Sequence, residues 1–297
     1  MTRRWQIKIT LALAVGLLSI MGWVHFGGSD NEAKEDPVSA QEKTTIKQNY
    51  IKTRLSKYLK SYTKDGTVSV SFYNLGAKPG SKAAKASNAD LYERGKLAVE
   101  SRSHTKHVSA STYKLFIAAY LMNLKKKGQF SWTKANKANV SNMIVHSRNE
   151  YAESVLNRYG QTSLNRFIKR NNWYSPVFKP YKAAGTTSHS LMLVLRDLHD
   201  YKGAFSNRSD AKRILGYMGR QVYRSGIPAG ARKAQKGTKV NDKVGWLGST
   251  NNDAGIVTLP NGQQYLLVVM THGHKQSGFS GFPKMTKRVQ EIVYENK

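Results

Sequence analysis

The chain has 297 residues, which is enough for one large domain or two small ones with a substantial buried core. Its 48 lysines and arginines outnumber 18 aspartates and glutamates, and the resulting formal charge of +30 attracts polyanions. The absence of cysteine excludes a disulfide framework and lipidation of a cysteine, so the folded part must be stabilised by its core.

The N-terminal segment has the features of an export signal. Basic residues over 3–8 precede a mostly apolar run over 9–26. This run is about 18 residues long, near the lower limit for crossing a bilayer, and no small-residue cleavage site follows closely. We expect residues 1–26 to be a signal anchor that passes once through the cell membrane, with its basic flank inside. If the segment is cleaved as a signal peptide, the protein is secreted.

The segment 27–43 is polar, contains glycine and proline, and is predicted to be a linker. The folded domain is then expected over residues 44–297. A basic, exported protein without disulfides fits the extracellular face of a Gram-positive cell, where teichoic acids and anionic lipids are the available polyanions. The alternative is a solvated basic surface with no polymer partner.

Hydrophobic patterns place strands at both ends of the domain and helices between them. Strands are predicted over 67–75, 95–101, 239–247, 252–260 and 263–271, and helices over 44–62, 111–126, 150–158, 162–170, 188–200, 209–219 and 283–296. This order indicates an α/β (α+β) fold, in which an antiparallel sheet forms from both chain ends. An all-helical lobe is inserted over about 103–235.

The segment SASTYKLFIAAYLM, residues 109–122, places Ser111 and Lys114 one turn apart where an apolar helix begins. Backbone amides and the helix dipole near such a serine favour a developing negative charge. A lysine whose pKa is lowered by burial or neighbouring cations can serve as the base that a serine nucleophile needs. The same S-x-x-K spacing occurs at Ser61 and Ser103, but neither opens an apolar helix. For the motif by itself, a surface lysine beside a helix-capping serine is the alternative.

Two further motifs follow in chain order, S-R-N at 147–149 and K-V-G at 243–245. Together with S-x-x-K they resemble the S-x-x-K, S-x-N and K-[T/S]-G elements of class A serine β-lactamases and related penicillin-binding proteins. Segments 186–198 and 221–230 are also similar to parts of this family. The resemblance covers about residues 45–296 and implies a β-lactamase/transpeptidase-like fold.

The resemblance implies catalytic roles for three residues. Ser111 would attack a carbonyl carbon and become acylated, and Lys114 would activate it. Ser147 would pass a proton to the leaving nitrogen.

It also implies substrate-binding roles. Asn149 would hydrogen-bond the substrate amide, and Lys243 would hold Ser147 and the substrate carboxylate. Next to Gly245, the backbone N–H of Trp246 would form an oxyanion hole with that of Ser111.

Three departures from the family pattern concern the site. Val244 replaces the usual hydroxyl residue, and the lost hydrogen bond to a substrate carboxylate costs about 1.5 to 3 kcal/mol. Arg148 stands where an acidic residue is usual, and it either lowers the pKa of Lys114 or points into solvent. The loop 171–188 contains no Asp or Glu, whereas class A β-lactamases carry there a glutamate that drives water onto the acyl-enzyme.

The nearest acids in the sequence, Glu150 and Glu153, are expected to cap the helix that follows Ser147. The residues therefore predict a cell-surface serine hydrolase that forms an acyl-enzyme with β-lactams or with D-alanyl amides or esters of the cell wall. Deacylation should be slow, so β-lactam hydrolysis should be weak, and a D-alanyl peptidase or esterase is plausible. The alternative is a catalytically degenerate module that binds anionic cell-wall polymer.

Other signals point to no cofactor. Four histidines near the first motif and the last strand have no acidic or cysteine ligand placed with them in the sequence, so no metal is expected: His104, His107, His272 and His274. The basic runs lack interleaved aromatic residues, so no nucleic-acid partner is expected. The predicted partners are the D-alanyl substrate or β-lactam, possible teichoic acid and the membrane, and a monomer is expected.

Overall fold

A computed structural model describes residues 39–274 and 279–294. The expected signal anchor, residues 1–26, and the linker up to residue 38 lie outside the described residues. Within the described ranges, no helix combines the length and the apolar composition that crossing a bilayer requires. Helix α2 (Ala40–Tyr62) begins four residues before the predicted helix, so the last part of the expected linker is helical.

A five-stranded antiparallel sheet forms the centre of the domain, with the strand order β2-β1-β7-β6-β5. Strands β1 and β7 pair side by side, so the two chain ends meet in one sheet as expected. Four strands lie close to their predicted ranges, whereas only the end of 95–101 is a strand. The bounds are β1 (Val68–Ala77), β2 (Val99–Ser101), β5 (Lys239–Leu247), β6 (Thr250–Thr258) and β7 (Gln263–Thr271).

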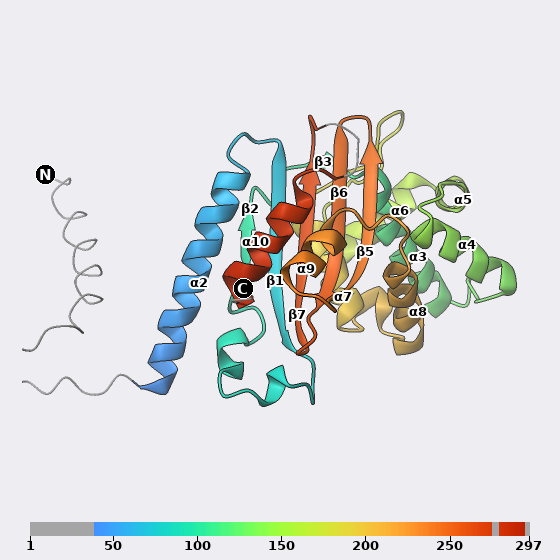
Figure 1. The fold of residues 1–297 in the computed structure, drawn as a ribbon. Coiled ribbons are helices and arrows are strands. Elements are labelled where there is room, and N and C mark those ends of the chain that lie inside the picture. The colour runs from blue at the N-terminus through green and yellow to red at the C-terminus, as the bar shows by residue number, and fades with distance from the viewer. Residues whose placement is uncertain (1–38, 275–278, 295–297) are drawn as a thin grey trace, which may run out of the picture. The chain divides into compact units, whose positions relative to one another are not determined.

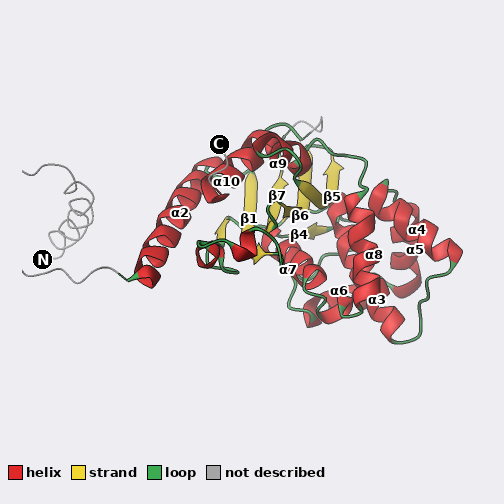
Figure 2. Ribbon diagram, turned by 60° about the horizontal axis from the view of Figure 1, so that its bottom comes forward, coloured by secondary structure: helices red, strands yellow, loops and turns green. Residues whose placement is uncertain are grey.

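Helices cover both faces of this sheet (Figures 1 and 2). Helices α2, α9 (Ile227–Ala234) and α10 (Phe282–Tyr294) cover one face, and α7 (Ser188–His199) lies against the other. Strand β7 shows why both faces are buried. Leu267 and Val269 belong to the core under α10, while Leu266 and Val268 belong to the core on the α7 side. Alternate residues of an extended strand point to opposite faces, so an almost continuous apolar run is needed here.

The remaining helices build a lobe beside α7. They are α3 (Lys114–Lys126), α4 (Lys134–Val145), α5 (Glu150–Tyr159), α6 (Gln161–Arg170) and α8 (Arg208–Gly219). Helix α3 is the centre of this lobe, because its residues from 114 to 122 are all buried. Burial on all sides explains why its sequence is apolar without a clear polar face.

Two helices were not predicted from the sequence. Helix α4 has a mostly polar sequence, but Thr133 caps it by accepting a hydrogen bond from the Asn136 N–H, and Val140 and Ile144 are buried. Helix α9 lies within the expected helical-lobe range of 103–235, yet it packs against α10 on the opposite face of the sheet. A Cβ at Gly230 of α9 would lie 2.5 Å from the Pro283 carbonyl oxygen, so only glycine permits this packing.

Candidate active site

The expected nucleophile lies at the junction of two helical segments. Ser111 is in the 3-10 helix η3 (Ala110–Tyr113), and Lys114 is the first residue of α3. Lys114 is fully buried, and its Nζ lies 2.9 Å from the Ser111 Oγ. The φ of Ala110 is 43°, in the left-handed region that non-glycine residues rarely adopt, so the chain is tightly bent just before the serine.

The contacts of Lys114 determine what its amine can do. Besides the Ser111 hydroxyl, Nζ donates to the Ser147 carbonyl oxygen and, at 2.6 Å, to Asn149 Oδ1. A neutral amine keeps two hydrogens, and two of these three neighbours can only accept hydrogen bonds. When Lys114 is neutral, its hydrogens therefore remain on the two carbonyl oxygens, and its lone pair faces the Ser111 hydroxyl.

The environment of Lys114 favours that neutral form. Burial lowers the pKa of Lys114 from its ordinary 10.5 to about 8, although the charges of Glu153 and Glu150 act in the opposite direction. These two glutamates lie in the first turn of α5, as expected, and both are exposed. Arg148 is also exposed, so its side chain points into solvent.

Ser147 connects the helical lobe to the sheet. Lys243 of β5 is fully buried, and its Nζ donates to Ser147 Oγ at 2.7 Å and to the Val244 carbonyl oxygen at 2.7 Å. Burial and the charge of Lys114 hold the pKa of Lys243 well below its ordinary value. Hydrogen bonds thus join Ser111, Lys114, Ser147 and Lys243 in one group, with Asn149 at its edge.

An ionic cluster that was not anticipated from the sequence lies next to Lys243. Asp242 forms an ion pair with Arg224, whose Nη2 also donates to the Val240 carbonyl oxygen at 2.8 Å. Asp253 accepts a hydrogen bond from the Ile227 N–H at 2.8 Å. Burial raises the pKa of Asp242 well above its usual range and that of Asp253 to about 6. Their negative charges favour the charged form of Lys243, which opposes the effect of its burial.

Gly245 allows β5 to pass directly beside the nucleophile. A Cβ at this position would lie 2.6 Å from the Ser111 backbone nitrogen and 2.8 Å from that of Thr112. Strand β5 is the edge strand of the sheet, and Trp246 follows Gly245 in it. The Trp246 ring packs on Tyr223 with ring centroids 4.6 Å apart, away from the hydrogen-bonded group.

The structure adds two findings about residues beside the third motif. Val244 is fully buried in the core under α9 and α10 and brings no hydroxyl to the site. Asn252 of β6 was not recognised, although its Nδ2 donates to the carbonyl oxygens of Val108 and Ser109 at 2.8 and 2.9 Å. Its Oδ1 accepts from the Thr271 N–H at 3.0 Å. The signal in the sequence is that two polar residues, Asn252 and Asp253, open the predicted strand 252–260.

Two short strands hold the ends of the segments that flank the site. Strand β3 (His107–Val108) leads into η3 and pairs with β4 (Gly185–Thr186), which ends the loop 171–188. Asn165 of α6 fixes this loop by accepting from the Val177 and Phe178 N–H groups at 2.9 and 3.0 Å. The loop brings no carboxylate to Ser111, because its sequence contains none.

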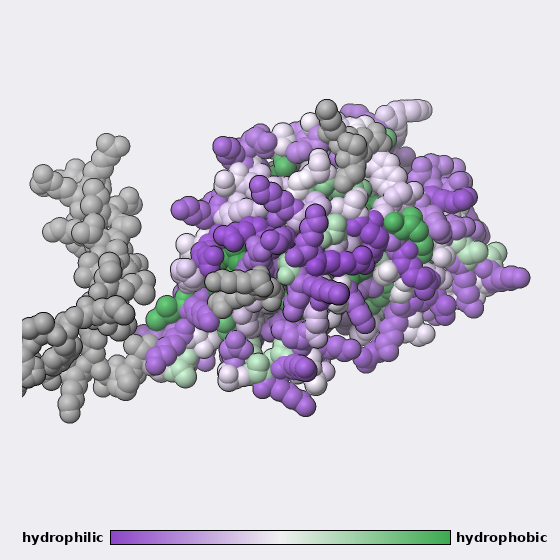
Figure 3. All heavy atoms as spheres, viewed as in Figure 1, coloured by the Kyte–Doolittle hydropathy of each residue, from purple (hydrophilic) through white to green (hydrophobic). Residues whose placement is uncertain are grey.

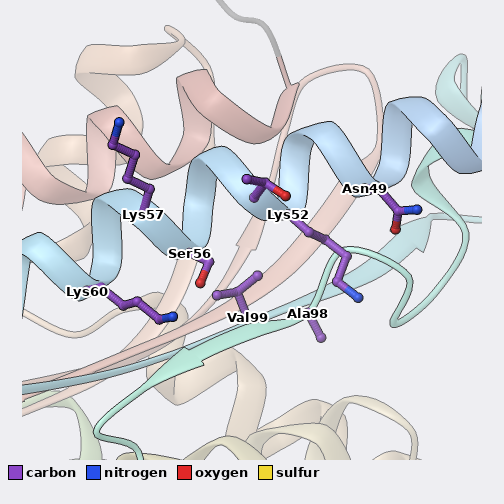
Figure 4. A pocket seen from close by; sticks show the side chains of 8 residues that line it. Asn49, Lys52, Ser56, Lys57, Lys60, Ala98 and Val99 are labelled. Atoms are coloured by element: carbon purple, nitrogen blue, oxygen red, sulfur yellow. The ribbon is translucent and has the colours of Figure 1, made fainter. Parts of the chain in front are cut away.

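A groove lies between α2 and β2, apart from the residues around Ser111. Its volume is about 720 Å³, and Figure 4 shows Lys52, Ser56 and Lys60 on α2 beside Val99 of β2 and the preceding Ala98. Lys57 extends from the same helix. The face of the domain that is viewed in Figure 3 is predominantly hydrophilic.

Comparisons with known proteins bear on the family and the fold of the chain. A sequence model of the "Beta-lactamase enzyme family" (Beta-lactamase2) matches residues 136–293, and no curated protein matches the chain.

Solved structures resemble the chain over most of its length. PBP-A has a TM-score of 0.61 and 17% identity, covering 82% of this chain and 94% of that chain. A mutant of PBP-A, solved as an acyl-enzyme complex with penicillin G, has a TM-score of 0.62 and 17% identity, covering 83% and 96%. The β-lactamase from Sphaerobacter thermophilus DSM 20745 has a TM-score of 0.63 and 14% identity, covering 82% and 98%. These likenesses establish the fold, and together with the family match they show that the chain belongs to the class A-like serine β-lactamase family.

Proposed function

We propose that this protein is a cell-surface serine hydrolase whose Ser111 is acylated by β-lactams or by D-alanyl amides or esters of the cell wall. The observation that carries the proposal is the 2.9 Å contact between the Ser111 hydroxyl and a fully buried lysine whose pKa is lowered to about 8. A base with a pKa near the working pH is suited to proton transfer from a weak nucleophile.

The acylation step follows from these contacts. Neutral Lys114 takes the proton of Ser111, and the Oγ forms a bond to the substrate carbonyl carbon. The negative charge that develops on the carbonyl oxygen is stabilised by the backbone N–H groups of Ser111 and Trp246. Ser147 donates its hydroxyl proton to the leaving nitrogen as the C–N bond breaks, and a proton from Lys243 replaces it through their 2.7 Å hydrogen bond.

Lys243 is the charged residue that we propose binds the substrate. Lys243 lies beside Ser147, so in its protonated form it attracts the carboxylate that β-lactams and D-alanyl peptides carry. Val244 contributes nothing to this contact, because its side chain is buried in the core under α9 and α10. Asn149, which accepts a hydrogen bond from Lys114, is proposed to bind the substrate amide as well.

Hydrolysis of the acyl-enzyme is proposed to be slow. The loop 171–188 contains no carboxylate that could activate water, and Glu150 and Glu153 lie on the exposed start of α5. Reactivity with penicillin is supported by the mutant PBP-A structure, which is described as an acyl-enzyme complex with penicillin G. The expected anchor at residues 1–26 leads us to propose a location on the extracellular face of a Gram-positive cell membrane.

A second candidate function is binding of anionic cell-wall polymer. The groove between α2 and β2 favours it, because Lys52, Lys57 and Lys60 line this hollow on a chain with a formal charge of +30. Binding there is compatible with acylation at Ser111. It would be the sole function if Ser111 proved unreactive.

Labelling with a fluorescent penicillin tests the proposal. We expect wild-type protein to be labelled covalently and Ser111→Ala to remain unlabelled. Ser61→Ala is the matched control, since Ser61 opens another S-x-x-K motif but is exposed at the end of α2, and it should be labelled like wild type. If folded wild-type protein takes up no label at high penicillin concentration, acylation at Ser111 is wrong and the polymer-binding function is favoured.

A further inference from the structure

Three side chains that are separate from the group around Ser111 converge on one point. Glu100 lies in β2, His104 in the turn that follows it, and His189 in the first turn of α7. One possible metal-ligand atom from each residue lies within 4.8 Å of those of the other two. In the described ranges 39–274 and 279–294, this is the one group of three or more such residues with that spacing.

The sheet register explains how Glu100 reaches α7. Glu100 pairs with Ser71 of β1, and the Ser71 hydroxyl contacts that of Ser188 at the start of α7 at 3.0 Å. Paired residues on neighbouring strands point to the same face, so Glu100 also points toward α7. There its Oε2 and Oε1 lie 2.9 and 3.0 Å from His189 Nδ1.

His104 is the third member of the group, with a ligand atom within 4.8 Å of those of Glu100 and His189. The two imidazole rings have centroids 4.5 Å apart, and His104 is exposed, so its ring can rotate without disturbing the core. The expectation that no acidic ligand accompanies these histidines is wrong for His104. The carboxylate is four residues upstream, and the second imidazole comes from a distant part of the chain.

The negative charge of the Glu100 carboxylate is also available to a cation. In a chain with 48 lysines and arginines, none of the described ones forms an ion pair with this carboxylate, and its charged neighbours are the two histidines. The other histidine–carboxylate pair differs in this respect. His199 contacts Asp200 at 2.9 Å, but the second oxygen of Asp200 is taken by Arg94 at 2.6 Å.

We propose that Glu100, His104 and His189 bind one divalent transition-metal ion of the Zn²⁺ type. Two imidazole nitrogens and one carboxylate oxygen suit Zn²⁺, with bonds of about 2.0 to 2.2 Å and a fourth position for water. In the metal-free protein a proton on His189 Nδ1 lies between the ring and Glu100. When the metal ion binds, that proton is released to solvent and the metal ion takes its place. Rotation of the exposed His104 ring then brings its nitrogen within bonding distance.

Bound metal would stabilise the segment of the chain that leads to Ser111. It would tie β2 and the turn after it to α7, whose first residues directly follow the β3–β4 pair. Ser109, two residues before Ser111, is held to the same place, because its N–H donates to the Ala184 carbonyl oxygen at 2.8 Å. The metal therefore stabilises the folded protein without contacting the reacting atoms.

Titration calorimetry with ZnCl₂ tests the proposal on the full-length, metal-free chain without a polyhistidine tag. We expect one Zn²⁺ per chain for wild type and a rise in melting temperature on zinc addition. Glu100→Gln and His189→Ala should each weaken zinc binding by about ten-fold or more. Cobalt-loaded wild type should show visible d–d absorption bands that are absent in both variants.

His199→Ala is the matched control, because it removes a histidine from a histidine–carboxylate pair that lacks a third ligand. It should bind zinc like wild type. Glu100→Gln keeps the shape of the side chain, so it remains informative if His189→Ala does not fold. The proposal is overturned if wild type binds no zinc, if Glu100→Gln binds it as tightly as wild type, or if His272→Ala abolishes binding instead.

Discussion

At the scale of single residues, the chemistry of the site depends on one amine. Lys114 is held by two carbonyl oxygens that fix its hydrogens, so its free electron pair faces the Ser111 hydroxyl. Burial destabilises the charged form of the Lys114 amine relative to the neutral form, and its pKa is lowered for this reason. An exposed lysine in the same sequence motif would remain charged near neutral pH and could not act as a base.

The first prediction concerns pH. Because the neutral amine is the reactive form and its pKa is about 8, the acylation rate should rise about ten-fold per pH unit below pH 8 and level off above it. Stopped-flow measurement of acylation by a fluorescent penicillin between pH 5.5 and 9.5 gives this profile.

Lys114→Ala tests whether this lysine produces the profile. The variant should be acylated about 10² to 10⁴ times more slowly than wild type, and its residual rate should lose the rise toward pH 8. Lys64→Ala, at the exposed lysine of the 61–64 motif, should keep both the rate and the profile. An unchanged profile in Lys114→Ala would assign the titration to another group.

Sequence reasoning identified the residues of this group because each belongs to a short motif. Ser111, Lys114, Ser147 and Lys243 occur in a fixed order, and the structure joins them by hydrogen bonds. It could not identify Asn252, because its partners on the segment before Ser111 lie more than a hundred residues away in the chain. Local sequence patterns do not predict contacts between residues so far apart in the chain.

At the scale of secondary-structure elements, the position of β5 against η3 determines the shape of the site. The strand can lie this close only because Gly245 has no side chain. Strands β5 and β7 were predicted with their observed bounds. In β7 a continuous apolar run that includes Tyr265, Val268 and Val269 is typical of a buried strand. Helices α4 and α9 were missed because one is polar and the other is short, and both are helical largely through their tertiary packing.

The second prediction tests this close approach. Gly245→Ala places a methyl group 2.6 Å from the Ser111 nitrogen, so β5 and η3 must separate. A shift of about 1 Å at a reacting group costs about 10²-fold in rate, and we expect a loss of that size in penicillin acylation.

Gly216→Ala is the control for this substitution. Gly216 lies in α8 with open space around its Cα, so alanine should leave acylation unchanged and stabilise the helix by up to about 1 kcal/mol. Acylation of Gly245→Ala at the wild-type rate would show that the strand does not control the position of Ser111.

The third prediction concerns the link between β6 and the segment before the nucleophile. Asn252→Ala leaves the Val108 carbonyl group and the Thr271 N–H without this partner inside the protein. The Ser109 carbonyl oxygen also loses it but still accepts from the N–H and Oγ1 of Thr112. Each buried group left unsatisfied costs about 1 to 3 kcal/mol, so the free energy of unfolding should fall by at least about 2 kcal/mol. Urea denaturation measures this change. The exposed Asn149→Ala should lose substrate reactivity with a much smaller loss of stability.

At the scale of the whole molecule, the excess positive charge is the feature that family membership does not explain. Lysines line the groove between α2 and β2, and α2 directly follows the segment expected to lead from the membrane. A polyanion bound there would keep the domain close to the cell surface. Composition alone predicted the attraction for polyanions, but it could not place the groove, which forms only when α2 packs beside β2.

The fourth prediction is that a teichoic-acid preparation binds this groove. Replacing Lys52 and Lys60 together with glutamine should weaken binding by about ten-fold or more, since each lysine near an anionic surface contributes about 1 kcal/mol. Binding should also weaken as salt is raised. Lys134→Gln combined with Lys137→Gln on α4 removes the same charge elsewhere and should have a smaller effect. Equal effects of the two pairs would show that net charge, and not the groove, attracts the polymer.

The measurement that tests the account most directly is mass spectrometry of the protein after brief exposure to penicillin G. The account predicts one penicilloyl adduct per chain, located on Ser111 within the tryptic peptide 107–114, and an adduct that persists after free penicillin is removed, because no carboxylate in 171–188 activates water. An adduct on another residue, or none at all on folded wild-type protein, would contradict the role of Ser111. Rapid disappearance of the Ser111 adduct would contradict slow deacylation.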